Sequence, residues 1–256
     1  MHVSYFGSSE RRLFGAYHPP EDGGERNAAV LLCGPAPQEY MQSHWVLRKL
    51  AARLATAGFH VLRFDYYGTG DSGGDSSAGS LEQWRADVVT ALQELRDAAA
   101  VRRVSVVGFR LGATLAAQAP IRVRDLVLWE PVVAGTAYLD ELRASHERCF
   151  AHCLHPPRLP RRGPLLEILG CPLPESVEAN VRDLQLGPPL ACRADRVAVV
   201  ASEDLTSHRR LIESLQGAGL ATAHETVPEP AGGDEPFLLS SVAQQRIAEL
   251  LTRRAS

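Results

Sequence analysis

Short apolar runs alternate with amphipathic segments along most of this chain. The apolar runs of strand length lie at residues 28–33, 59–65, 103–109, 125–130 and 196–202. Such runs predict strands that are buried on both faces of a sheet. The helical spacing of apolar positions predicts helices over residues 42–57, 81–98, 206–217 and 238–253. Strand and helix in alternation indicate right-handed β-α-β crossovers and a parallel sheet.

Further strands flank this pattern, and one long segment interrupts it. Residues 2–8 and 11–18 alternate apolar with polar around a short turn, which predicts an antiparallel pair at the sheet edge, and 222–228 predicts a last strand. The sheet is therefore expected to be mostly parallel and eight-stranded, with helices on both faces. Residues 132–190 are rich in proline, and their two short helical candidates, 136–153 and 175–185, predict an inserted helical lid. The predicted core is then 1–131 together with 191–256.

The segment that follows the apolar run at 103–109 contains the main candidate for chemistry. Gly108-Phe-Arg-Leu-Gly112 joins that run to a helix-forming tail, so it predicts a strand, a sharp turn and a helix. A guanidinium stays protonated in proteins, so Arg110 can be neither nucleophile nor general base. A buried cation needs an anion, and the sequence offers Glu130 and Asp204. Two interpretations stay open: a salt bridge inside a dead site, or a receptor for a substrate carboxylate, phosphate or thioester carbonyl.

Several motifs together resemble those of a known family. They occupy residues 31–35, 38–44, 63–74, 108–116 and 126–133. The chain resembles α/β-hydrolases of the serine-aminopeptidase-like type, and more closely the exosortase-system-associated hydrolases, which implies the α/β-hydrolase fold. In that superfamily the turn reads Gly-x-Ser-x-Gly, and its serine is the nucleophile. The arginine at position 110 is the main departure from that pattern.

The resemblance also implies where the other catalytic groups of the superfamily would fall. The oxyanion-hole amides would be those of Leu111 and of the Pro35-Ala36 loop, and Ala36 must serve because proline has no N–H. The triad acid would be Asp204, with Glu130 as the alternative. The triad histidine would lie in residues 228–236, which contain none, and His224 lies inside the preceding predicted strand. The resemblance therefore predicts that the usual acyl-serine mechanism is closed.

Residues just beyond the oxyanion loop are predicted to line the pocket. These are Glu39, Tyr40 and His44. His44 is a candidate general acid or base, weighed against a surface or capping role, and His208 is a similar case.

Two other polar groups are better explained by structure than by chemistry. Asp65 and the Gly68-x-Gly70-x-Ser72 loop lack the lysine of a phosphate-binding loop, so a structural turn is favoured and Ser72 is a weak candidate nucleophile. His146, Cys149 and Cys153 share a helix face, but packing is favoured over zinc. We expect no metal and no cofactor.

Composition excludes some classes of function. A net charge of −3 without a basic stripe argues against nucleic-acid binding, and no apolar run is long enough to cross a bilayer. Five cysteines without an export signal favour free thiols and a cytoplasmic location. A monomer and a homodimer both remain open.

The function that fits these features best is action on a small acyl substrate, ester or thioester, or on an anionic one, free or on a carrier protein. The reaction would belong to a biosynthetic pathway and would use Arg110 as anchor or electrophile, without an acyl-serine. A non-catalytic binding module and a cofactor-free lyase or cyclase are the alternatives.

Overall fold

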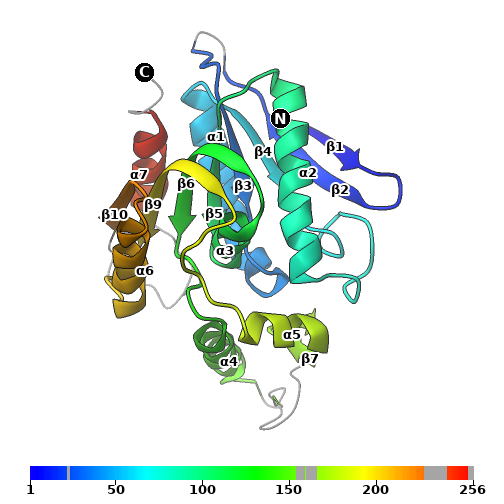
Figure 1. Ribbon diagram of the computed structural model, residues 1–256. Helices are drawn as coiled ribbons and strands as arrows, with labels where there is room; N and C mark the ends of the chain where they lie inside the picture. The colour runs from blue at the N-terminus through cyan, green and yellow to red at the C-terminus, as the bar shows by residue number, and fades with distance from the viewer. Residues whose placement is uncertain (22–23, 154–158, 160–165, 228–240, 253–256) are drawn as a thin grey trace.

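One mixed sheet forms the centre of the computed structural model, which describes residues 1–21, 24–153, 159, 166–227 and 241–252 (Figure 1). The described strands of this sheet run in the order β1-β2-β4-β3-β5-β6-β9-β10. Their bounds are β1 His2–Gly7, β2 Arg12–His18, β3 Ala29–Cys33, β4 His60–Phe64, β5 Val104–Phe109, β6 Arg122–Trp129, β9 Arg193–Ala201 and β10 Thr222–Thr226. β2 pairs antiparallel with β1 and β4, and the other pairs are parallel. The predicted eight-stranded, mostly parallel sheet is confirmed.

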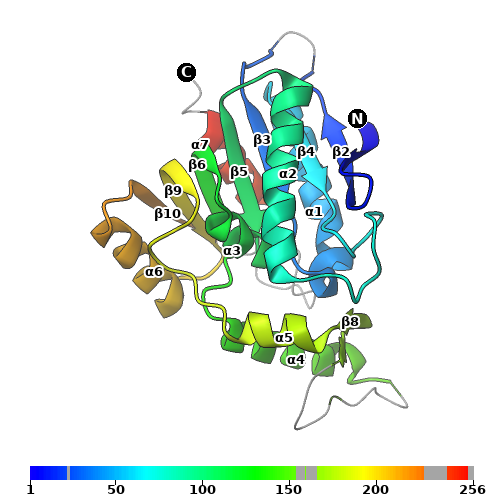
Figure 2. The ribbon, with the colours of Figure 1, turned by 45° about the vertical axis from the view of Figure 1, so that its right-hand side comes forward.

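Helices cover both faces of the sheet (Figures 1 and 2). Their bounds are α1 Pro37–Thr56, α2 Leu81–Ala99, α3 Leu111–Gln118, α6 Thr206–Gly217 and α7 Ser241–Thr252. The buried residues divide into two clusters, because successive residues of a strand point to opposite faces. Val106 packs with α2, α3 and α6, whereas Val107 packs with α1 and α7. This explains why every residue of the central strands β3 and β5 is buried.

Helix boundaries follow local chemistry closely. The hydroxyl of Ser80 accepts a hydrogen bond of 3.1 Å from the backbone N–H of Gln83 and so caps α2. α1 begins at Pro37, five residues before the predicted start, with the proline in its first turn. The rigid ring of proline fits that position because the first helical N–H groups have no partner within the helix. The early start places Glu39 in the first turn of α1.

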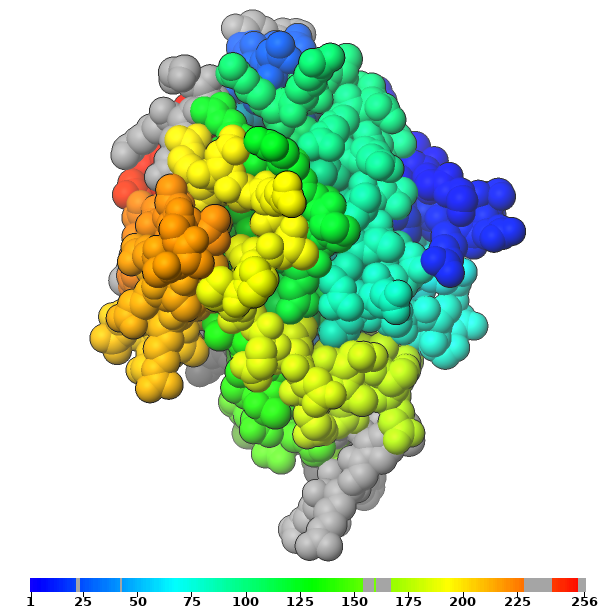
Figure 3. Space-filling model, viewed as in Figure 1, coloured from blue at the N-terminus to red at the C-terminus, as the bar shows by residue number. Residues whose placement is uncertain are grey.

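The segment between β6 and β9 forms a small layer beyond the carboxyl ends of the parallel strands (Figure 2). It contains α4 (Gly135–Phe150), a hairpin of β7 (Leu166–Ile168) and β8 (Cys171–Leu173), and α5 (Glu175–Arg182). The hairpin was not predicted, because three-residue strands leave almost no periodic signal. α5 packs against α2, and Figure 3 shows them as one continuous surface. The division into core and lid at residues 132–190 stays a prediction.

Candidate active site

The turn between β5 and α3 has the strained backbone of a nucleophile elbow. Arg110 has φ 54° and ψ −123°, a conformation that non-glycine residues rarely adopt. A Cβ on Gly112 would lie 2.1 Å from the carbonyl oxygen of Gly34, and one on Gly108 would lie 2.4 Å from the Cα of Ala113. Both glycines are therefore required by close backbone contact. The elbow is complete in its backbone, although its central side chain is an arginine.

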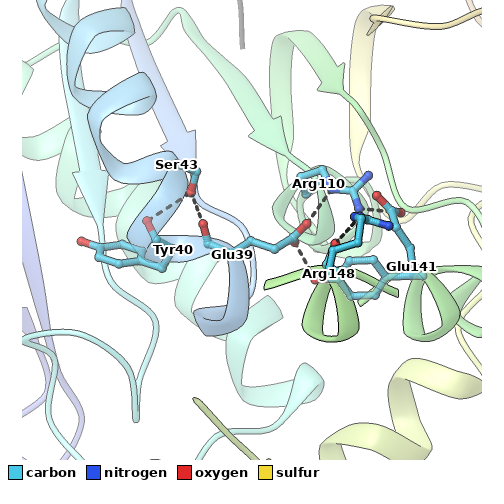
Figure 4. A network of polar contacts seen from close by, with 8 residues as sticks. Glu39, Tyr40, Ser43, Arg110, Glu141 and Arg148 are labelled. Carbon is cyan, nitrogen blue, oxygen red and sulfur yellow. Dashed lines mark hydrogen bonds and ion pairs between the residues drawn. The ribbon is translucent and has the colours of Figure 1, made fainter. Parts of the chain in front are cut away.

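Two carboxylates and one aromatic ring hold the Arg110 side chain (Figure 4). Nε lies 2.8 Å from Oε1 of Glu39, and Nη2 lies 2.7 Å from Oε2 of Glu141. The guanidinium carbon also lies 5.4 Å from the ring centre of Tyr138, in the geometry of a cation–π contact. The side chain of Glu39 is 0% exposed and that of Glu141 is 51% exposed. The Glu39 carboxylate is therefore fully buried, whereas that of Glu141 reaches the surface.

The prediction that Glu130 or Asp204 would neutralise Arg110 is wrong. Glu130 accepts a hydrogen bond from the backbone N–H of Ser202, and Asp204 forms an ion pair of 3.4 Å with Arg209. The actual partners come from α1 and α4, which approach the elbow only in the folded chain.

Glu39 joins the inserted segment to the core. Its Oε1 accepts from Arg110, and its Oε2 accepts a hydrogen bond of 2.6 Å from the hydroxyl of Tyr138 on α4. Burial disfavours the charged form of Arg110, but Glu39 and Glu141 hold its pKa above the ordinary value. Burial, followed by the charge of Glu39, raises the pKa of Tyr138. Two carboxylates thus surround one guanidinium.

A cavity of about 410 Å³ opens beside this network. Arg110 and Tyr138 line it together with Glu130, Glu141, Glu203 and His208. Burial raises the pKa of Glu130, although hydrogen bonds from Ser202 and the charge of Arg110 oppose the shift. Burial also lowers the pKa of His208, whose Nδ1 has no hydrogen-bond partner among the described residues. The cavity therefore brings together the predicted Arg110 and Glu130 at the carboxyl ends of β5 and β6.

The predicted oxyanion-hole amides lie on adjoining segments. Leu111 is the first residue of α3, and Ala36 directly precedes α1. The contact between Gly112 and Gly34 brings these two segments together. Within the described parts of the chain, the backbone N–H groups of Leu111 and Ala36 make no hydrogen bond. Both amides are therefore available as donors.

Other predicted site residues lie apart from this cavity. His44 and Tyr40 line a separate hollow of about 230 Å³ with Arg63 and Asp65. The rings of His44 and Tyr40 stack with their centres 6.1 Å apart. Pro35 and Tyr40 line a third hollow of about 190 Å³. Asp204 is 51% exposed and does not line the cavity at Arg110. Of the three residues predicted after the oxyanion loop, Glu39 alone contacts Arg110.

Ser72 and its loop have structural contacts. Its Oγ donates to the carbonyl oxygen of Asp65 at 2.6 Å and accepts from the backbone N–H of Phe14 at 2.8 Å. A carboxylate oxygen of Asp65 accepts from the N–H of Asp71 at 3.0 Å. These contacts fit the favoured interpretation of a structural turn.

The cysteines and histidines of α4 do not gather at one point. Cys149 and Cys153 are exposed, whereas His146 is buried and its Nδ1 accepts from the N–H of Leu169 at 3.0 Å. Across the described residues, no group of three or more His, Cys, Asp or Glu side chains is arranged to hold a metal ion. None of the described helices combines the length and apolar character needed to span a membrane. The predicted histidine position, residues 228–236, lies outside the described residues.

Sequence reasoning missed Tyr138 and Glu141. They are three residues apart on α4 and therefore share one face of the helix. The sequence did contain a signal for them, because this tyrosine and glutamate lie on the same apolar helix face as Leu142, which is buried.

Comparisons with known proteins agree with this fold. The profile of the family described as Serine aminopeptidase, S33 matches residues 39–209, more than half of the chain. None of the curated proteins compared matches the sequence. The fold is similar to that of Est1E from Butyrivibrio proteoclasticus with ferulic acid bound, with TM-score 0.66, 12% identity and 98% of each chain covered. A putative hydrolase from Agrobacterium vitis gives TM-score 0.60 and 17% identity over 100% of this chain and 98% of its own. Mouse alpha/beta hydrolase domain-containing protein 10 gives TM-score 0.57 and 15% identity over 99% of this chain and 98% of its own.

Proposed function

The chain belongs to the serine aminopeptidase S33 family of α/β-hydrolases, and we propose that it acts on a small acyl substrate, an ester or thioester, without an acyl-serine intermediate. The observation that carries this proposal is the ion-paired arginine in an intact elbow. A permanent cation occupies the position of the nucleophile, so an attacking group must come from elsewhere. Water is the simplest such group.

The elbow and the cavity beside it would together supply the groups that direct attack by water requires. The Leu111 and Ala36 amides belong to the elbow and to the loop before α1, whereas Arg110 and Glu130 line the cavity. The substrate carbonyl oxygen would accept hydrogen bonds from the Leu111 and Ala36 amides. Nη1 of Arg110, which has no ion-pair or hydrogen-bond partner among the described residues, would donate a further hydrogen bond. Glu130 would take one proton as water adds to the carbonyl carbon. Collapse of the tetrahedral intermediate would break the bond to the alcohol or thiol, which recovers that proton from Glu130.

The charge of the cavity favours a neutral substrate over an anionic one. The carboxylates of Glu39 and Glu141 already neutralise Arg110, and Glu130 and Glu203 add acidic groups to the wall. An anion would be repelled by these groups unless it displaced Glu141. An uncharged ester or thioester avoids this cost.

The proposal is tested by measuring the hydrolysis of a set of acyl esters and acyl thioesters by the purified protein. Glu130→Gln should reduce kcat/KM on any active substrate by about 10²- to 10⁴-fold, because a positioned general base contributes that much. Glu213→Gln, on the exposed surface of α6, is the matched control and should leave the rate unchanged. Full activity of Glu130→Gln, or labelling of a serine by a fluorophosphonate, would exclude this mechanism.

A non-catalytic binding module is the second candidate, and one observation favours it. The contacts of Glu39, Tyr138 and Glu141 fix Arg110 from two other segments, as in a purely structural network. Absence of turnover on every ester and thioester, together with saturable binding of one of them, would decide for this candidate.

A further inference from the structure

Another hollow lies at the opposite end of the sheet from Arg110, where the parallel strands begin. It measures about 630 Å³ and is lined by Val123 and six charged residues: Arg96, Arg102, Arg103, Arg122, Arg124 and Asp195. Figure 1 shows that this end of the sheet faces away from α4 and α5. β5 has six residues, so roughly 20 Å separates the two ends at 3.3 Å per residue. We call this hollow the arginine groove.

The topology of the sheet brings these arginines together. Arg102 and Arg103 directly precede β5, and Arg122 is the first residue of β6. Because β5 and β6 are parallel neighbours, their first residues lie at the same end of the sheet. Arg96 comes from the last turn of α2, and its Nη2 donates to the carbonyl oxygen of Arg122 at 2.6 Å. The positive charges therefore come from three separate segments that the fold holds in place.

Most of this positive charge is not neutralised by the protein. Asp125 pairs with Arg196 at 2.9 Å and lies 3.7 Å from Arg124. Within the described ranges, Arg102, Arg103 and Arg122 have no ion pair with a carboxylate. The chain as a whole has a net charge of −3, so this excess of positive charge is local. An uncompensated cluster of this kind attracts an anion.

We propose that the arginine groove binds a small organic ligand that carries two or more phosphate groups. The guanidinium fork matches phosphate oxygens in pairs, and arginines on three segments can hold more than one phosphate. The volume lies within the range of small-molecule sites, and a concave groove suits a compact ligand better than an extended polymer. This site is independent of the proposed acyl chemistry at the other end of the sheet.

Calorimetric titration of the full chain at fixed ionic strength tests this, with inorganic pyrophosphate, tripolyphosphate and orthophosphate as probes. Pyrophosphate and tripolyphosphate should saturate at one site and bind at least tenfold more tightly than orthophosphate. The double variant Arg102→Gln/Arg103→Gln should weaken them at least tenfold, since both side chains are exposed and the change leaves the backbone intact. Arg102→Gln alone should give an intermediate loss.

The matched control is Arg53→Gln/Arg210→Gln, which removes two exposed arginines outside the groove. This control should bind pyrophosphate and tripolyphosphate as tightly as the natural protein does. Equal losses in the control and the groove variant would overturn the proposal, because they would show that net charge alone governs binding. Absence of saturable pyrophosphate binding, or binding of heparin alone, would also overturn it.

Discussion

Replacing Glu39 by glutamine isolates the contribution of one buried charge to the elbow. Glutamine keeps the size of the side chain, so no cavity forms, but it removes the negative charge that faces Arg110. It also places an amide donor where Glu39 accepts from two donors, Arg110 and the hydroxyl of Tyr138. One of these donors then loses its acceptor, although the Tyr138 oxygen can itself accept from the amide. Because the Glu39 side chain is 0% exposed, water cannot replace the lost contact.

The expected cost in the free energy of unfolding is about 3 kcal/mol. Breaking a buried ion pair by removing one partner costs about 3–5 kcal/mol. The lower end of this range applies, since Glu141 remains at 2.7 Å from Nη2 of Arg110 and still compensates its charge. Glu141→Gln is the matched control on the same guanidinium. Its side chain is 51% exposed, so we expect a cost of at most about 1 kcal/mol.

Urea unfolding followed by tryptophan fluorescence measures both variants, since the chain has three tryptophans. With a slope of about 3 kcal/mol per molar urea, 3 kcal/mol lowers the midpoint by roughly 1 M. Glu39→Gln should show this shift with an unchanged slope, and Glu141→Gln should shift by a third of it or less. If the two variants lower the midpoint equally, the argument from burial is refuted. The double variant Glu39→Gln/Arg110→Met should cost less than the sum of the single changes, because the two residues are in direct contact.

Three further perturbations test other parts of the structure. Gly112→Ala should prevent folding or lower the melting temperature by many degrees, because its Cβ would meet a backbone carbonyl at 2.1 Å; Gly217→Ala, with open space around it, should be neutral or stabilising in a thermal melt. Burial, with help from nearby positive charge, lowers the pKa of His18 from 6.5 to about 4. Between those values the unfolded chain binds a proton that the folded chain does not, so stability should be complete above pH 6.5 and fall towards pH 4. His18→Gln should flatten that slope in denaturant titrations at several pH values, and an unchanged slope would assign it to other groups. Burial raises the pKa of Glu130 above 4.5, so the acid limb of the kcat/KM profile should have its midpoint above that value; a limb that survives Glu130→Gln would have another origin.

The sequence predicted the sheet and the elbow because both depend on local patterns. Apolar runs identify buried strands, and Gly108 and Gly112 identify a turn with close backbone contacts. The requirement that Arg110 have an anionic partner was also predictable from the cost of burying a charge.

The identity of that partner was not predictable, for two physical reasons. Glu39 and Tyr40 are neighbours on a helix, about 100° apart around its axis, so they cannot both face Arg110. Because α1 begins earlier than its apolar spacing indicated, its phase could not be fixed from the sequence. Glu141 lies on α4, whose position over the elbow depends on how the inserted segment packs. Contacts between segments of this kind depend on tertiary packing, which periodicity does not encode.

The ion pairs at the elbow also bear on how this chain could have diverged from a relative with serine at position 110. A single change of Arg110 back to serine would leave Glu39, Glu141 and the hydroxyl of Tyr138 around a space with no cation. Glu39, whose side chain is 0% exposed, would then hold a buried charge without a counterion, whereas the half-exposed Glu141 would face water. Reversal at this position therefore requires a compensating change at Glu39 on α1, which makes the loss of the serine hard to undo by a single mutation.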